Sequence, residues 1–252
     1  MKHITLAILS IFLVLFTGCQ FSENIYMNAD GTGKMEFSMD ASELMLMAGD
    51  EMSKENNGKA MDSTIVFKDF LEEKKDSIAT LPQEDQAKLK ALEDFKMHIM
   101  MDPETKKMVF DLSTDFKYAR DLQDMFKAMN SMSNFQGQGG TDPNDASNPF
   151  ASMGSHGSTQ VSYTYDNNTF KRIGKIIDKE QHQQTMDSLN SMAMMFGGSN
   201  YKLNYNFPKP VKSVSNENAM LSQDRKTVTL EVGFMESLKD PELLNIEVIL
   251  ED

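Results

Sequence analysis

Side chains that could act as nucleophiles or bind metals are few in this chain and lie far apart. Ser155 and His156 are adjacent within the stretch GSHGS. Neighbours in an extended loop point to opposite sides, and no strand-to-helix elbow surrounds this pair. His98, His156 and His182 fall in three separate predicted elements and share no metal-ligand spacing. Acidic residues are numerous but scattered on polar faces, without an acid/base couple. We therefore expect no catalytic residue, no metal site and no cofactor.

Methionine is unusually abundant, with 22 residues against no tryptophan. Thioether sulfurs can bind Cu(I), whereas a flexible apolar side chain also fills a core well. The central methionine cluster recurs at the helical period on a stripe that a core requires. Core packing is the favoured interpretation, and an apolar binding groove and a copper site are the alternatives. The three clusters are Met45, Met47 and Met52; Met125, Met129 and Met132; and Met186, Met192, Met194 and Met195.

A calcium loop is the other metal site to consider. The stretch TDPNDASN offers Asp142, Asn144 and Asp145 as oxygen ligands. An EF-hand loop also needs a central glycine and a closing glutamate at fixed positions, and neither is present. We interpret this stretch as a turn.

Cys19 is the single cysteine, so no internal disulfide can form. It follows a segment typical of a secretory signal peptide, with Lys2 and His3 before an apolar run over 4–16. That run is shorter than the roughly 20 apolar residues that a membrane-spanning helix needs. Thr17 and Gly18, both small, then separate it from Cys19. We expect residues 1–18 to be a cleaved signal peptide.

The tetrapeptide Phe16-Thr17-Gly18-Cys19 resembles the lipobox of bacterial lipoproteins, with phenylalanine at a position where leucine is usual. The resemblance implies a diacylglycerol on the Cys19 thiol, palmitate-type acylation and cleavage between Gly18 and Cys19. The alternative is an ordinary signal peptide beside a chance cysteine. Gln20 is not aspartate, so by the enteric sorting rule the chain resembles outer-membrane rather than inner-membrane cargo; the leaflet stays open.

The formal net charge of −13 limits the kinds of partner that the protein surface can bind. Basic residues are not concentrated enough to bind nucleic acid. Anionic lipid headgroups should repel the protein surface. We therefore expect membrane attachment through the lipid on Cys19 and no nucleic-acid partner.

Alternating apolar and polar residues predict three β-hairpins, over 24–40, 97–112 and 161–170. Further strands are expected over 203–207, 211–214, 228–234 and 246–250. Helices are expected over 41–52, over 64–79 with Ser63 as its cap, from Pro82, over 117–132 and over 179–196. Residues 133–159 are rich in Gly, Ser, Asn and Asp and predict a disordered loop.

These elements predict an α+β fold with a mainly antiparallel sheet built from hairpins and several amphipathic helices packed on it. We expect residues 19–23 to be the lipidated cysteine with a short tether. Residues 24–252 should form a single domain, with one sheet shared across the loop.

The strand pattern also resembles a known family. An early strand, DGTG at 30–33 and a second strand, followed later by YKLNYNFPKPVKSV and KTVTLEV, are similar to the lipoprotein domains typified by mycobacterial LppM. The resemblance rests on 24–40 and 201–232. It implies a small lipid-anchored α+β envelope domain with a hydrophobic-ligand role, and it transfers no functional residue.

The sequence therefore predicts a lipid-anchored cell-envelope lipoprotein with a non-enzymatic binding or structural role. Its partner would be an envelope protein or a hydrophobic ligand. A carrier of lipid or another hydrophobic ligand is the alternative, and an envelope enzyme is the least favoured hypothesis.

Overall fold

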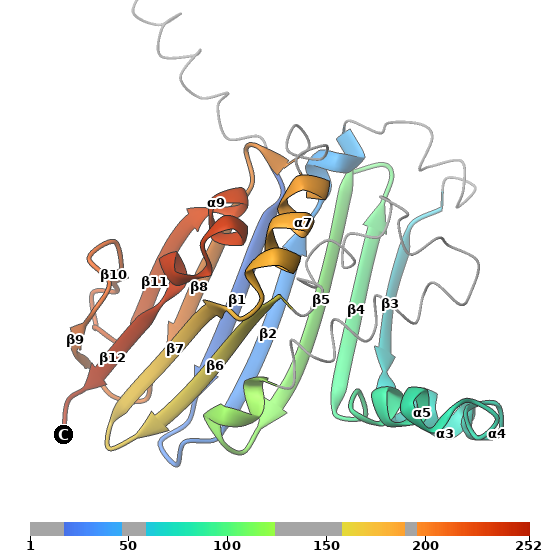
Figure 1. Ribbon diagram of the computed structural model, residues 1–252, viewed down its shortest axis with the longest axis horizontal. Coiled ribbons are helices and arrows are strands. Elements are labelled where there is room, and N and C mark those ends of the chain that lie inside the picture. Colours follow the sequence, from blue (N-terminus) through green and yellow to red (C-terminus); the bar gives the residue numbers. More distant parts are fainter. Residues whose placement is uncertain (1–17, 47–58, 124–157, 190–195) are drawn as a thin grey trace, which may run out of the picture.

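The computed structural model describes residues 18–46, 59–123, 158–189 and 196–252. Two β-sheets dominate these ranges, and the small one lies across one half of the large one (Figure 1). Mainly antiparallel pairing is confirmed, but the expected single shared sheet is wrong. Within these ranges, no helix is both long and apolar enough to cross a membrane.

The large sheet has eight strands, and β1 lies near its centre. β1 pairs parallel with β8, and the other pairings in this sheet are antiparallel. The strand order is β10 (Met220–Leu221), β11 (Thr227–Gly233), β8 (Asn200–Asn206), β1 (Gln20–Met27), β2 (Gly33–Asp40), β5 (Lys107–Phe116), β4 (Phe95–Asp102) and β3 (Met61–Val66).

The small sheet has four antiparallel strands and covers the region of β11, β8, β1 and β2 (Figure 1). The turn between β6 and β7 has two residues, Asn167 and Asn168, with φ of 48° and 59°. Asparagine tolerates positive φ, which a two-residue type I′ hairpin turn requires. The strand order is β6 (Thr159–Asp166), β7 (Thr169–Ile176), β12 (Ile246–Leu250) and β9 (Val211–Val214).

The helices are short, and the expectation of several amphipathic helices packed on the sheet is not confirmed. Those with described bounds are α3 (Phe67–Glu73), α4 (Lys75–Ile78), α5 (Gln83–Lys90), α7 (Lys179–Leu189), α9 (Phe234–Lys239) and the 3₁₀ helices η1 (Ala119–Leu122) and η4 (Pro241–Leu244).

Two helix predictions need correction. The helix expected from Ser63 is wrong at its start, because residues 61–66 form β3 and α3 begins only at Phe67. The helix expected over 117–132 is wrong at its start, because Tyr118 is extended and the 3₁₀ helix η1 begins at Ala119; residues 124–132 lie outside the described ranges. The loop predicted over 133–159 also lies outside them up to residue 157, and β6 begins at Thr159.

The core lies between the two sheets and continues along the same face of the large sheet beyond the small one. Phe170 of β7 packs edge-on against Tyr205 of β8, with ring centroids 5.3 Å apart. Buried methionines contribute to this core, namely Met27, Met35, Met39, Met45, Met97 and Met108. Of the methionine clusters noted in the sequence, only Met45, which is buried, and Met186, which is partly buried, are described, and the core-packing interpretation of the others stays a prediction because they lie outside the described ranges: Met47, Met52, Met125, Met129, Met132, Met192, Met194 and Met195.

Candidate functional site

Cys19 lies immediately before the first strand of the large sheet, and its side chain is only 1% exposed. Burial, and then the carboxylates of Asp40 and Glu43, raise the pKa of the Cys19 thiol to about 11. Gly18 lies against the backbone of Gly198, where an added Cβ would come within 2.2 Å of the carbonyl carbon. In this arrangement the thiol is packed and protonated rather than reactive.

The residues expected as a tether are part of the fold. β1 begins at Gln20, so residues 20–23 are its first half and not a flexible spacer. A diacylglycerol on Sγ would not fit in the buried position, so an acylated Cys19 has to lie outside the core. This displacement leaves the pairing of β1 with β2 and β8 intact, because the pairing starts at Gln20.

Glu23 of β1 is the one acidic residue among the fully buried side chains of the described ranges, at 0% exposure. Three tyrosine hydroxyls donate to its carboxylate: Tyr163 at 2.7 Å, Tyr201 at 3.0 Å and Tyr205. Tyr201 and Tyr205 come from β8 of the same sheet, and Tyr163 comes from β6 of the small sheet. The carboxylate is thus shared between both sheets.

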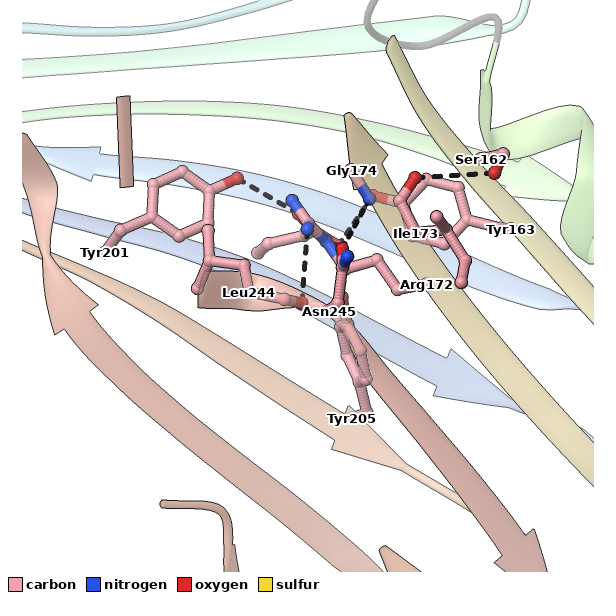
Figure 2. A network of polar contacts seen from close by, with 10 residues as sticks. Ser162, Tyr163, Arg172, Ile173, Gly174, Tyr201, Tyr205, Leu244 and Asn245 are labelled. Carbon is pink, nitrogen blue, oxygen red and sulfur yellow. Dashed lines mark hydrogen bonds and ion pairs between the residues drawn. The ribbon is translucent and has the colours of Figure 1, made fainter. Parts of the chain in front are cut away.

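Arg172 of β7 completes this buried network (Figure 2). Its Nη2 lies 3.3 Å from Oε2 of Glu23, and its Nε lies 3.4 Å from both carboxylate oxygens. Its Nη1 donates to the carbonyl oxygen of Leu244 at 3.3 Å. Nearby, the Gly174 N–H donates to the side chain of Asn245 at 2.6 Å (Figure 2). Arg172 therefore ties the small sheet both to β1 and to η4.

The electrostatics of the network follow from its burial. Burial first, and then the charge of Glu23, raise the pKa of Tyr163, Tyr201 and Tyr205 well above the ordinary tyrosine value. Burial alone would lower the pKa of Arg172, but the Glu23 carboxylate outweighs it and the net shift is upward. The tyrosines stay neutral donors and the arginine stays charged. Each of the three hydroxyls and each of the three Arg172 nitrogens has an acceptor, so the network joins the two sheets.

A second polar chain crosses four strands on the other face of the large sheet. Ser38 Oγ of β2 donates to Asp111 Oδ1 of β5 at 2.5 Å, and His98 Nδ1 of β4 lies 3.1 Å from Asp111 Oδ2. His98 Nε2 lies 2.9 Å from Asp62 Oδ1 of edge strand β3. Hydrogen bonds to Asp111 and then to Asp62 raise the pKa of His98. Ser38 contacts a carboxylate and not the imidazole, so the chain is not a nucleophile with its base.

The remaining residues singled out from the sequence are not brought together. His182 is buried on α7, with Nε2 3.1 Å from the carbonyl oxygen of Lys239. Ser155, His156 and the 142–145 stretch lie outside the described ranges. Across the described part of the chain, no group of three or more His, Cys, Asp or Glu side chains is arranged to hold a metal ion.

Sequence reasoning missed both polar networks. Glu23 interrupts the inward series of Phe21, Ile25 and Met27 on an otherwise apolar strand face. A charge at such a position requires a buried partner, so the pattern could have revealed Glu23. It could not have named Arg172, which lies 149 positions later.

Comparison with known proteins gives one distant structural likeness. No protein-family model and no curated protein sequence matches the chain. The NMR structure of the folded domain of LppM from Mycobacterium tuberculosis matches with a TM-score of 0.39 and 7% sequence identity. The match covers 92% of this chain and 91% of that one. A likeness at this TM-score and sequence identity transfers neither family nor function.

Proposed function

We propose that this chain is a lipid-anchored lipoprotein of the bacterial cell envelope, with a non-enzymatic binding or structural role. The observation that carries the proposal is the position of Cys19. A signal-like apolar run and two small residues precede it, and β1 begins one residue after it. Lipid on Cys19 would hold the domain close against the bilayer, without a stalk.

The burial of Cys19 in the unmodified chain is compatible with this role on energetic grounds. Moving the cysteine outward loses the packing of one small side chain. Each methylene that an acyl chain buries in a bilayer contributes about 0.8 kcal/mol, so one chain of ordinary length outweighs that loss. Acylation before β1 docks would avoid the buried state altogether.

We propose the outer membrane in preference to the inner one, because Gln20, not aspartate, follows the cysteine. The net charge of −13 supports attachment by lipid rather than by the protein surface. Its partner would then be another envelope protein or a hydrophobic ligand. An enzymatic role is less favoured, since the polar networks described above are satisfied internally.

Membrane fractionation tests the anchor. Cys19→Ser should release the protein from the membrane fraction or leave residues 1–18 uncleaved. Ser22→Ala, three residues further along β1, is the matched control and should behave as the wild type. A Cys19→Ser protein that is still processed and still membrane-bound would refute the proposal.

A carrier of hydrophobic ligands is the second candidate, favoured by a groove of about 550 Å³ between α3, α4 and α5. Leu71, Ile78 and Leu89 line it, with Lys68 and Lys90 among its charged residues. That volume lies within the range of small-molecule sites. Figure 1 shows these helices at one end of the large sheet, beside β3 and β4.

Native mass spectrometry separates the two candidates. A carrier predicts lipid co-purifying with detergent-free Cys19→Ser protein and lost in the additional variant Ile78→Asp. Leu243→Asp, at an exposed leucine on η4, is the control. Lipid-free protein, or lipid retained equally in both variants, would count against the carrier.

A further inference from the structure

A small pocket lies where the turn between β1 and β2, the 3₁₀ helix η1 and the end of β6 come together. These three segments lie near the lower edge of Figure 1. The pocket has a volume of about 240 Å³. The residues that give it chemical character are Asp30, Lys117, Tyr118, Arg120, Thr164 and Tyr165.

One wall of the pocket is fixed by a close contact between two segments. Gly31 has φ of 84°, and a Cβ added there would lie 3.4 Å from the ring of Tyr165. The turn backbone therefore approaches the Tyr165 ring closely. Burial raises the pKa of Tyr165, so its hydroxyl stays a neutral hydrogen-bond donor at physiological pH.

Two cations face this pocket. Arg120 stacks on Tyr118, with Cζ 4.5 Å from the ring centroid. Stacking holds the guanidinium plane and leaves its N–H edge available to a ligand. Lys117 is the second cation. Among the described residues, neither Lys117 nor Arg120 forms an ion pair with a carboxylate, although the chain is strongly acidic overall.

Two carboxylates near the pocket, those of Asp30 and Asp121, already have local partners. Asp30 Oδ1 accepts hydrogen bonds from the Thr32 N–H at 3.1 Å and the Thr32 hydroxyl at 2.7 Å. Asp121 Oδ2 accepts from the Tyr118 N–H at 2.9 Å. These bonds shape the turn and η1, and no residue in the described ranges donates to the second carboxylate oxygen of Asp30, which can accept a hydroxyl.

We propose that this pocket binds an acidic sugar unit, a single sugar ring that carries a carboxylate or a phosphate. The volume suits one ring. Tyr118 and Tyr165 supply apolar lining for the C–H groups of that ring, and Lys117 with Arg120 matches its acidic group by charge-assisted hydrogen bonds. Asp30 can accept a hydrogen bond from a ring hydroxyl, and Thr164 lines the same pocket. The inference goes beyond the anchoring role and does not require Cys19 to be acylated.

Isothermal titration of the full chain, purified in a non-ionic detergent, tests the inference. The probes are glucuronate, glucose 6-phosphate, glucose and inorganic phosphate. Both acidic sugars should bind about tenfold or more tightly than glucose and than inorganic phosphate, since a hydrogen bond to a charged group carries this difference. The tighter of the two tells whether a carboxylate or a phosphate is preferred.

Matched charge removals locate the site. Arg120→Gln and Lys117→Gln should each weaken binding of the acidic sugars about tenfold or more. Lys212→Gln, on β9 at the opposite edge of the small sheet, removes the same charge and should leave binding unchanged. Circular dichroism checks that each variant is folded. Three results would overturn the inference: no binding at about millimolar ligand, glucose or phosphate binding as tightly as the acidic sugars, or equal losses in all three variants.

Discussion

Arg172 and Glu23 form a buried ion pair that crosses from the small sheet to the large one, with Nη2 and Oε2 3.3 Å apart. Both side chains are almost wholly shielded, at 3% and 0% exposure. Removing two charges from water is costly, and the cost is recovered only where hydrogen bonds satisfy both groups. Here three tyrosines and the Leu244 carbonyl supply those bonds, so the pair fixes how the two sheets face each other.

Arg172→Met should be strongly destabilising. It leaves the Glu23 carboxylate buried without a counter-charge, a change that costs about 3–5 kcal/mol. The free energy of unfolding, measured by guanidinium denaturation and followed by tyrosine fluorescence, reports this loss. Arg225→Met is the matched control, because Arg225 is half exposed and its ion-pair distance to Glu251 is 4.0 Å. It should cost less than about 1 kcal/mol. Equal losses in both variants would mean that the buried pair has no special role.

The three tyrosine hydroxyls should each contribute measurably. Tyr163→Phe, Tyr201→Phe and Tyr205→Phe each remove one donor to a buried carboxylate, which costs about 1.5–3 kcal/mol. Tyr26→Phe is the comparison, because Tyr26 is 44% exposed on the same strand as Glu23. The Tyr26→Phe variant should lose almost no free energy of unfolding in the same denaturation experiment. If the buried tyrosines tolerate the change as well as Tyr26, the network is not a joint between the sheets.

His98 should make stability depend on pH. Its pKa is raised in the folded state by Asp111 and Asp62. The stabilisation by charged His98 is therefore fully present when the pH is below the unfolded-state pKa of about 6.5. It is lost as the pH rises through the raised pKa of the folded state. The difference in unfolding free energy between wild type and His98→Gln, measured from pH 5 to pH 9, should shrink with increasing pH. A difference that stays constant or grows over that range would contradict the described contacts.

The Cys19 thiol should be unreactive while the unmodified chain is folded. With the pKa raised to about 11 by burial and by Asp40 and Glu43, little thiolate exists at pH 8. Alkylation of protein made by cell-free synthesis, which prevents lipidation, should be about a hundredfold or more slower than in denaturant. A Gln20→Cys substitution in the Cys19→Ser background provides an exposed control thiol. Fast labelling of native Cys19 would show that the cysteine is not packed as described.

The first hairpin could be predicted from the sequence because its alternation of apolar and polar residues matches the burial along both strands. Phe21, Ile25 and Met27 of β1 point inward, as do Met35, Phe37 and Met39 of β2. β3 was missed for a physical reason. Ser63 is a good helix cap, but Ile65 and Val66 are β-branched, and pairing with β4 prevails over the local signal.

Contacts between distant segments could not be predicted from one sequence. The chain forms two sheets because β9 pairs with β12, and β12 also pairs with β7, instead of joining the large sheet. No local sequence pattern specifies which neighbour a strand takes. The Glu23 network unites residues from β1, β6, β7 and β8, and the His98 chain unites four other elements. The three tyrosines look ordinary alone, since tyrosine is enriched in strands.

The most direct test of the lipoprotein assignment is the mass of the N-terminal peptide from protein extracted from the membrane. The assignment predicts a peptide that begins at Cys19 and carries a diacylglycerol on its sulfur. A peptide that retains residues 1–18, or one that begins near this position with an unmodified Cys19, would contradict it.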